Sequence, residues 1–287
     1  MSTPKPAQLD GRIAIVTGAS RGIGAEIARL FAAEGAAVAV TSRTVEEGTG
    51  PFEGSITTTV DEILAAGGTA VAVAADLSKP DDRARLVAEA TAALGPVDIV
   101  VNNGAVTFFE PVTVFTERHW RLMFEVQVRA PFELAQAVLP GMVERGRGSI
   151  LNISSKAALH PELGVSGRPD GASTGGTVYG MVKAALERFS TGLAAELQGT
   201  GVTCNALSPT SIVPTPGVVH HQLITPEREA WVEPVDVMAR AALALVGGEL
   251  NGRIAYSHQL LAELGQADPP AGHLVVGTHP RHRYGDE

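Results

Sequence analysis

The sequence predicts an α/β fold in which helices cover both faces of a parallel sheet. Short apolar segments of strand length alternate regularly with longer segments of helical periodicity. Hydrophobic residues make up 45% of the chain and charged residues only 18%, which favours a well-filled core. Nothing divides the 287 residues into two domains, and no internal repeat is present. We therefore expect a single domain with both sheet faces buried.

The alternation gives the expected elements in order. Predicted strands cover Arg12–Thr17, Ala36–Ser42, Thr69–Ala75, Val97–Asn102, Ser149–Ser154 and Val202–Leu207. Predicted helices cover Ile23–Glu34, Val60–Ala66, Asp81–Leu94, Thr116–Leu139 and Val178–Gln198. Segments rich in glycine or proline predict long loops at 46–55, 161–177 and 209–226. The last two flank the helix 178–198, so we expect them to be substrate loops.

Composition and charge exclude several classes of function. A net charge of −9 and a pI near 5.4 argue against nucleic acid or an anionic membrane as a partner. The single cysteine, Cys204, excludes an internal disulfide and is typical of a reducing cytosol. The first 12 residues lack the apolar core of a signal peptide, and no stretch approaches the roughly 20 apolar residues of a membrane span. The histidines have no recognisable metal-ligand spacing. We expect a soluble, cytoplasmic protein without a metal.

A glycine-rich turn joins the first predicted strand to the first predicted helix. Gly18, Gly22 and Gly24 lie in this turn. Backbone N–H groups at a helix N-terminus bind phosphate, and glycine permits close approach of a pyrophosphate. The turn therefore predicts a dinucleotide site, with an ordinary glycine-rich turn as the alternative.

The helix 178–198 carries Tyr179 and Lys183. Four residues rotate a helix by roughly 400°, so the phenol and the ammonium share one face, about 6 Å apart along the axis. A positive charge at that range lowers a phenol pKa that is otherwise about 10. The pair predicts a general acid or base. A tyrosine and a lysine exposed on an amphipathic helix are the alternative.

Five motifs occur in the order found in one enzyme family: Thr17–Gly24, Asn102–Ala105, Asn152–Ser155, Tyr179–Lys183 and Asn205–Pro216. On these motifs the chain resembles the classical short-chain dehydrogenases/reductases from about Gly11 to Gly217, and more weakly to Tyr256. The resemblance implies a Rossmann-type doubly wound sheet of about seven strands. It also implies a catalytic core at about 11–257 with a C-terminal extension at 258–287, and a homo-oligomer, either a tetramer or a dimer.

The resemblance assigns the catalytic roles. Tyr179 exchanges a proton with the substrate oxygen, Lys183 lowers the pKa of Tyr179 and holds the cofactor ribose, and Ser155 stabilises the reacting oxygen. Gln127 stands where relatives have asparagine, so we expect it as a fourth member whose water-linked relay to Lys183 is shifted. Ser155 and Tyr179 are 24 positions apart, about twice the usual family interval. They converge if residues 160–177 loop outward and wall the substrate pocket.

Ser42 occupies the strand-end position where an NAD site places an acidic residue, and Arg43 follows it. A guanidinium binds a 2′-phosphate that a carboxylate would repel, and Arg21 is able to reach the same phosphate. The resemblance therefore implies a preference for NADP(H), with NAD(H) possible and a solvated Arg43 as the alternative. It adds cofactor contacts from Gly18, Ser20, Gly22, Ile23, Gly24, Asp76, Leu77, Asn103, Gly104, Ala105, Pro209, Ile212 and Thr215, besides Tyr179 and Lys183. For Asp76, a turn or helix-cap role is the alternative.

The leading expectation is an NADP(H)-dependent oxidoreductase that interconverts a ketone and a secondary alcohol. A catalytically silent NADP-binding sensor or scaffold is the second class, and dehydration or epimerisation on the same scaffold is the third. Loops rich in Val, Ile, Leu and Pro favour an apolar small-molecule substrate, cyclic or steroid-like, and leave acyl thioesters open.

Overall fold

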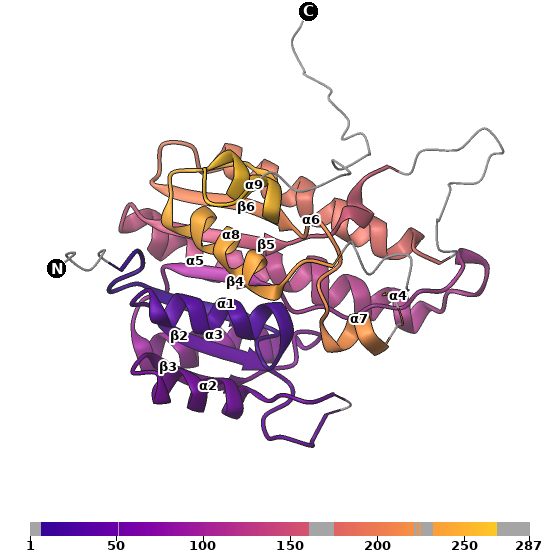
Figure 1. Ribbon diagram of the computed structural model, residues 1–287, viewed down its shortest axis with the longest axis horizontal. Helices are drawn as coiled ribbons and strands as arrows, with labels where there is room; N and C mark the ends of the chain where they lie inside the picture. The colour runs from indigo at the N-terminus through magenta and orange to yellow at the C-terminus, as the bar shows by residue number, and fades with distance from the viewer. Residues whose placement is uncertain are drawn as a thin grey trace, which may run out of the picture.

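The computed structural model describes residues 7–50, 52–160, 175–220, 222, 224 and 232–268. Within these residues the chain forms a seven-stranded sheet, ordered β3-β2-β1-β4-β5-β6-β7, in which every neighbouring pair is parallel (Figure 1). The strands are β1 (Ile13–Thr17), β2 (Ala37–Ser42), β3 (Thr69–Ala74), β4 (Ile99–Asn102), β5 (Gly148–Ile153), β6 (Val202–Ser208) and β7 (Ile254–Tyr256). The predicted doubly wound α/β fold is thereby confirmed.

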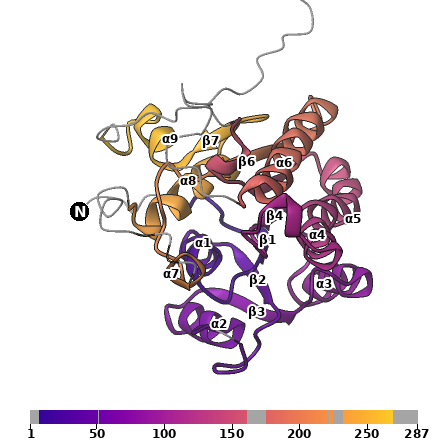
Figure 2. The ribbon, with the colours of Figure 1, turned by 90° about the vertical axis from the view of Figure 1, so that its right-hand side faces the viewer.

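Helices form one layer on each side of the sheet (Figure 2). Successive strand residues point to opposite faces, so each strand contributes to both layers. Ala14 and Val16 pack in one apolar cluster with α1, α2, α8 and α9, whereas Ile15 packs in another with α3, α5 and α6. The helices are α1 (Gly22–Ala33), α2 (Ile56–Ala65), α3 (Pro80–Leu94), α4 (Glu117–Phe124), α5 (Ala130–Glu144), α6 (Thr177–Glu196), α7 (Pro216–His220), α8 (Val235–Gly247) and α9 (Ser257–Glu263).

Two predicted helices have different limits in the structure. Helix α2 begins at Ile56 instead of Val60, because the Ser55 hydroxyl accepts the N–H of Thr58 and caps the helix there. The long predicted helix 116–139 is three segments: α4, a π-helical segment at Glu125–Arg129, and α5. A π-helical segment adds a residue to one turn, which no hydrophobic period reveals, and such segments are frequent at functional sites.

The chain beyond 208 contains elements that the sequence did not predict. Helix α7 begins at Pro216, where the missing proline N–H is tolerated at a helix start. Helix α8, strand β7 and helix α9 follow. Leu260 and Leu261 of α9 are buried in the same core as β1 and α1, so the start of the expected C-terminal extension packs on the domain itself.

The strand order reverses between β1 and β4, which are neighbours in the sheet although two strands separate them in sequence. In open α/β sheets, ligands bind beyond the carboxyl ends of the strands at such a reversal. The segments that follow β1, β4 and β5 therefore define where to look for the site. Among the described residues, no helix is long and apolar enough to cross a membrane.

Candidate active site

The glycine-rich turn lies between β1 and α1, as predicted. Gly18 and Gly22 have positive φ values of 64° and 56°, a left-handed conformation that favours glycine. A Cβ atom on Gly24 would lie 2.6 Å from the carbonyl oxygen of Gly18. Arg21 occupies the N-cap position of α1 without a capping hydrogen bond from its side chain. The first N–H groups of α1 thus lack a side-chain acceptor, which suits an anionic ligand such as a pyrophosphate.

Thr17 and Asn103 fasten the ends of β1 and β4 together. The Thr17 hydroxyl donates to the carbonyl oxygen of Val101 at 3.1 Å and accepts the N–H groups of Asn103 and Gly104, each at 2.9 Å. Asn103 Nδ2 donates to the carbonyl oxygens of Thr17 and Gly18. The Asn103 side chain therefore stabilises the glycine-rich turn, and it does so without any ligand.

Gly104 lies against Leu77 and the glycine-rich turn. A Cβ atom on Gly104 would lie 2.7 Å from Leu77 Cδ1, and a Cβ atom on Gly18 would lie 2.8 Å from the Cα of Gly104. Glycine at 104 thus leaves room for Leu77, while Ala105 is exposed. Leu77, Gly104 and the glycine-rich turn meet at one place, as the cofactor assignment requires.

Arg21 is held by the segment that follows β2. Its Nη2 donates to the carbonyl oxygen of Gly54 at 2.8 Å and to Thr44 Oγ1 at 3.0 Å, and its guanidinium lies 5.6 Å from the ring centre of Phe52. Burial lowers the pKa of Arg21, and the nearby carboxylate of Glu47 opposes this effect. Arg21 Nε is buried without a hydrogen-bond partner among the described residues. This orphaned donor fits a phosphate oxygen.

Ser42 and Arg43 end β2 beside this cluster. Ser42 Oγ accepts the N–H of Thr44 at 2.9 Å, and Arg43 is exposed to solvent. No carboxylate therefore occupies the last position of β2, and Arg43 is free to turn toward a bound phosphate. This arrangement agrees with the NADP(H) expectation without distinguishing it from a solvated Arg43.

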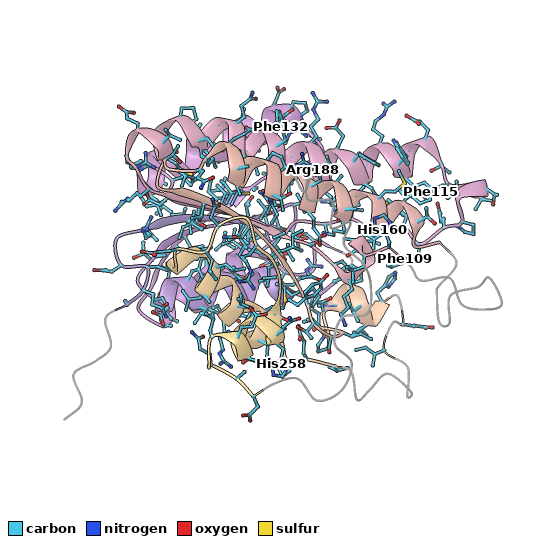
Figure 3. The ribbon with its side chains drawn as sticks, turned by 90° about the horizontal axis from the view of Figure 1, so that it is seen from above. Phe109, Phe115, Phe132, His160, Arg188 and His258 are labelled. Atoms are coloured by element: carbon cyan, nitrogen blue, oxygen red, sulfur yellow. The ribbon has the colours of Figure 1, made fainter. Side chains whose placement is uncertain are left out.

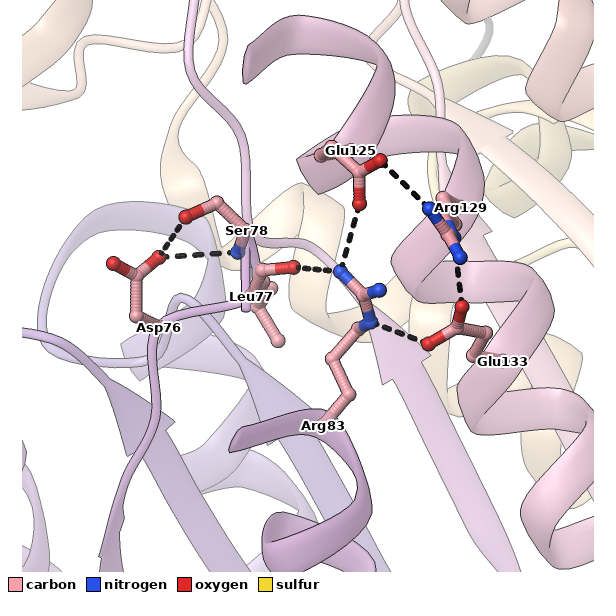
Figure 4. Close-up of polar contacts among 7 residues, drawn as sticks. All are labelled: Asp76, Leu77, Ser78, Arg83, Glu125, Arg129 and Glu133. Carbon is pink, nitrogen blue, oxygen red and sulfur yellow. Dashed lines mark hydrogen bonds and ion pairs between the residues drawn. The ribbon is translucent and has the colours of Figure 1, made fainter. Parts of the chain in front are cut away.

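Asp76 and Leu77 follow β3 in a tight turn (Figure 4). Asp76 Oδ1 accepts both the N–H and the hydroxyl of Ser78, at 3.0 and 2.7 Å. Asp76 thus forms a turn in the structure, which is the alternative role expected for it. The carbonyl oxygen of Leu77 accepts a 2.7 Å hydrogen bond from Nη1 of Arg83, whose side chain is only 1% exposed.

Arg83 also binds two glutamates, one on the π-helical segment and one on α5. Its Nη1 contacts Glu125 Oε2 at 3.1 Å and its Nε contacts Glu133 Oε2 at 2.6 Å, while Arg129 bridges the same two carboxylates (Figure 4). The Arg83 guanidinium and that of Arg129 hold the pKa of Glu133 below its usual range. The network joins the segment at Leu77 to the π-helical segment that carries Gln127.

The structure brings Ser155, Tyr179 and Lys183 together despite the long interval between them. Ser155 follows β5 and begins a short 3₁₀ helix, Lys156–Ala158, where its Oγ accepts the N–H of Ala157 at 3.2 Å. Tyr179 lies in the first turn of α6 and is hydrogen-bonded to Ser155. Lys183 Nζ lies 5.7 Å from the centre of the Tyr179 ring. The predicted outward loop, at 160–177, lies mostly outside the described residues.

The protonation of Tyr179 and Lys183 depends on their burial. Burial raises the pKa of Tyr179, and the hydrogen bond with Ser155 opposes this effect. Lys183 Nζ donates to the carbonyl oxygen of Ile153 at 2.8 Å and lies 5.7 Å from the centre of the Tyr179 ring. Burial lowers the pKa of Lys183 to about 8, and the carboxylate of Glu187 raises it. That Lys183 also lowers the pKa of Tyr179 stays a prediction.

Gln127 lies in the π-helical segment and is 1% exposed. Its Nε2 donates to the carbonyl oxygen of Val106 at 2.7 Å, whereas its Oε1 has no partner among the described residues. No direct hydrogen bond joins Gln127 to Lys183 within the described part of the chain. A role for Gln127 in proton transfer therefore stays a prediction.

The segment after β6 returns to the glycine-rich turn. Thr215 Cγ2 would lie 3.1 Å from a Cβ atom on Gly22, so this segment packs directly on the start of α1. Ile212 accepts the N–H of Glu233 at 2.9 Å and forms a parallel bridge with Val232. Pro209 begins the segment directly after β6. The contacts predicted between this segment and the nicotinamide thus come from a part of the chain that is fixed at both ends.

Thr210, which replaces a family glycine, caps helix α9. Its Oγ1 accepts the N–H groups of His258 and Gln259 at 3.0 and 3.4 Å, and its own N–H donates to Ser257 Oγ at 3.0 Å. Ser257 Oγ in turn donates to Glu233 Oε1 at 2.6 Å. The substitution thus ties the segment after β6 to the C-terminal helix.

Aromatic side chains border Tyr179. The ring of Phe109 lies edge-on to Tyr179, with ring centres 5.6 Å apart. Gly175, with φ of 109°, allows this approach, since a Cβ atom there would lie 2.8 Å from the backbone of Phe109 and Glu110. Figure 3 shows Phe109 and His160 at one end of the molecule, whereas Phe132 and Arg188 lie along α5 and α6. A partly apolar surface therefore adjoins the hydroxyl of Tyr179.

The fold and this constellation define an oxidoreductase site with a nucleotide-binding turn, and the chain belongs to the short chain dehydrogenase family, whose model matches residues 12–222. A short chain dehydrogenase of Pseudocercospora fijiensis is 38% identical over 236 residues, which cover 82% of this chain and 70% of that protein. A 3-oxoacyl (acyl-carrier-protein) reductase of Agrobacterium tumefaciens, solved with NADP bound, is 30% identical with a TM-score of 0.73, covering 86% of this chain and 93% of that one. A 7α-hydroxysteroid dehydrogenase, solved with NADH and 7-oxo glycochenodeoxycholic acid, is 30% identical with a TM-score of 0.74, covering 89% and 96%.

The sequence reasoning missed several residues that shape the site. Ser154 and Glu187 are absent from the predicted site. The position of Glu187, four residues after Lys183, is a signal that could have identified it, because the two residues share one helix face. Thr17 begins the glycine-rich motif, but the motif alone does not predict its hydrogen bonds to the end of β4. Glu233 had no local signal, because its partners at 210 and 257 are distant in sequence.

Proposed function

We propose that the protein is an NADP(H)-dependent oxidoreductase that interconverts a ketone and a secondary alcohol, with Tyr179 as the general acid and base. One observation carries this proposal: the hydrogen bond between Tyr179 and Ser155 beside the buried Lys183. A tyrosine and a lysine that merely decorated the surface of a helix would make no such contact. The bond also converges on the edge of the sheet where the glycine-rich turn opens.

The bound nicotinamide supplies or accepts the hydride, and the residues of this chain manage the proton. In reduction, Tyr179 gives its hydroxyl proton to the carbonyl oxygen while Ser155 donates a hydrogen bond to the same oxygen. In oxidation, the tyrosinate removes the proton from the alcohol. A phenol whose pKa is raised by burial holds its proton near neutral pH, so the resting protonation favours the reductive direction.

NADP(H) is preferred over NAD(H) in this proposal, since no carboxylate ends β2 and both Arg21 and Arg43 lie beside that position. Relatives of known structure bind NADP or NADH. Phe109 and the apolar side chains around Tyr179 favour an apolar, cyclic substrate. The 3-oxoacyl and 7-oxo steroid chemistry of two structural neighbours lies within this range. A cytoplasmic homo-oligomer completes the proposal.

The test is an NADPH-depletion screen across cyclic, steroidal, aromatic and β-ketoacyl carbonyls. We expect turnover on at least one of these, and a loss of about a hundredfold in kcat for Tyr179→Phe, the usual scale for a general acid. Titration of NADPH binding to both proteins is the control, and the two affinities should agree. Binding without turnover on any carbonyl would favour a silent sensor or scaffold, and substrate conversion without net NADPH consumption would favour dehydration or epimerisation.

A further inference from the structure

Three successive residues at the end of β5 bind three residues on one face of α6. The carbonyl oxygen of Ile153 accepts Lys183 Nζ at 2.8 Å, and Ser155 is hydrogen-bonded to Tyr179. Ser154, which lies between Ile153 and Ser155 in the chain, donates through its Oγ to Glu187 Oε1 at 2.6 Å. Because the helix residues are spaced by four, the three contacts lie one helical turn apart.

Glu187 is the one helix residue of this ladder without a role in the proposed reaction. Its side chain is 4% exposed, and Ser154 is equally buried, so the contact between them is shielded from water. Buried carboxylates are costly unless they are hydrogen-bonded or paired with a cation. Glu187 has both kinds of partner, because Lys183 precedes it by one turn on the same face.

We propose that Glu187 is a positioning residue for catalysis, which keeps Lys183 charged and holds α6 at the register where Tyr179 meets Ser155. This inference rests on the proposed function. Glu187 does not touch the substrate. It acts through Lys183 by its charge and through Ser154 by its hydrogen bond.

The titration of the buried groups supports this assignment. The Glu187 carboxylate raises the pKa of Lys183, against the burial that brings this pKa down to about 8. Burial raises the pKa of Glu187 to about 7, against the hydrogen bond from Ser154 and the charge of Lys183. From β7, the phenol of Tyr256 also faces Glu187, whose charge raises the pKa of Tyr256.

Glu187→Gln separates charge from shape, since an amide oxygen still accepts the Ser154 hydroxyl. Without the carboxylate the pKa of Lys183 falls further, so Lys183 loses its proton at lower pH. We expect the alkaline limb of the kcat/KM profile to move down by about one pH unit, with roughly fivefold lower kcat/KM at pH 8. Glu196→Gln, an exposed glutamate on the same helix, is the matched control and should leave the profile unchanged.

A second variant and a second readout cover the other outcomes. Ser154→Ala removes the hydrogen bond and raises the pKa of Glu187, so it should shift the limb in the same direction by a smaller amount. Lysine ¹³Cε chemical shifts report the pKa of Lys183 directly, and this pKa should fall in Glu187→Gln whether or not a substrate is found. An unchanged Lys183 pKa and pH profile in folded Glu187→Gln would overturn the inference. Retained turnover in Tyr179→Phe would instead overturn the proposed function.

Discussion

At the scale of single residues, burial decides protonation more than the spacing of Tyr179 and Lys183 does. The spacing of four correctly placed both groups on one helix face, and Lys183 Nζ lies 5.7 Å from the Tyr179 ring. Spacing alone does not reveal that Lys183 donates to the carbonyl oxygen of Ile153, nor that burial raises the pKa of the Tyr179 phenol. Both effects come from residues distant in sequence. The Tyr179 phenol therefore keeps its proton in the resting protein. The direction of proton transfer then depends on Ser155 and the substrate.

Arg43 carries the cofactor preference at this scale. Arg43→Ala removes a guanidinium available to a 2′-phosphate, so we expect kcat/KM with NADPH to fall about tenfold while kcat/KM with NADH changes little. Steady-state kinetics with both cofactors make the measurement. Arg121→Ala, an exposed arginine on α4, should alter neither value. Equal losses with the two cofactors, or an initial preference for NADH, would contradict the assignment.

At the scale of elements, one buried arginine joins helices that the sequence treated as separate. Arg83 links the turn at Leu77 with the π-helical segment and α5. From sequence alone Arg83 is interpreted as a solvated charge on a helix, because its carboxylate partners lie 42 and 50 residues away. The strand ends that bear the cofactor residues were predictable, since parallel strands place their carboxyl ends on one edge. The connections behind that edge were not.

Arg83→Met tests this link. The substitution removes three hydrogen bonds, and it leaves Glu125 and Glu133 still paired with Arg129. We expect the free energy of unfolding to fall by about 2 kcal/mol, less than for a fully stranded buried pair. The KM for the cofactor should rise because the turn at Leu77 loses its anchor. Arg85→Met, on the exposed face of the same helix, is the control, and urea denaturation should show a change below about 1 kcal/mol.

The fold was largely predictable at the level of strand and helix alternation, and least so near the end of the chain. Strand β7 has three residues, too few to give a pattern, and α9 is secured by Thr210 from 47 positions earlier. Glu233 joins Ser257 to the segment after β6, and its distance of 24 positions from Ser257 likewise leaves no local signal. Contacts of this kind follow from the folded geometry and not from any local period.

At the scale of the whole molecule, the buried acid Glu233 makes stability depend on pH. Burial raises its pKa to about 7, against hydrogen bonds from Ser257, Ser211 and Thr210 and the charge of Lys156. A raised acidic pKa means that the folded state binds the extra proton. The associated stability is therefore complete below about pH 4.5 and is lost as the pH rises through about 7.

Glu233→Gln should remove this dependence while keeping an acceptor for Ser257. Relative to the wild type, the variant should gain roughly 3 kcal/mol of unfolding free energy between pH 4.5 and 7.5. Chemical denaturation at several pH values gives the comparison. Glu249→Gln, at an exposed glutamate, should follow the wild type throughout. Parallel curves for Glu233→Gln and the wild type would show that the carboxyl group is already ionised in the folded protein at low pH.

The family model ends at residue 222, yet the sheet is completed only by residues 251–256. Asn251, Gly252 and Arg253 take up backbone groups of Cys204 and Ala206, and β7 covers the remainder of β6. A protein shortened to its recognisable homologous region would thus present a bare row of amide and carbonyl groups along the edge of β6. Such an edge invites strand addition between copies, so truncation at the family boundary would yield aggregates rather than a minimal enzyme.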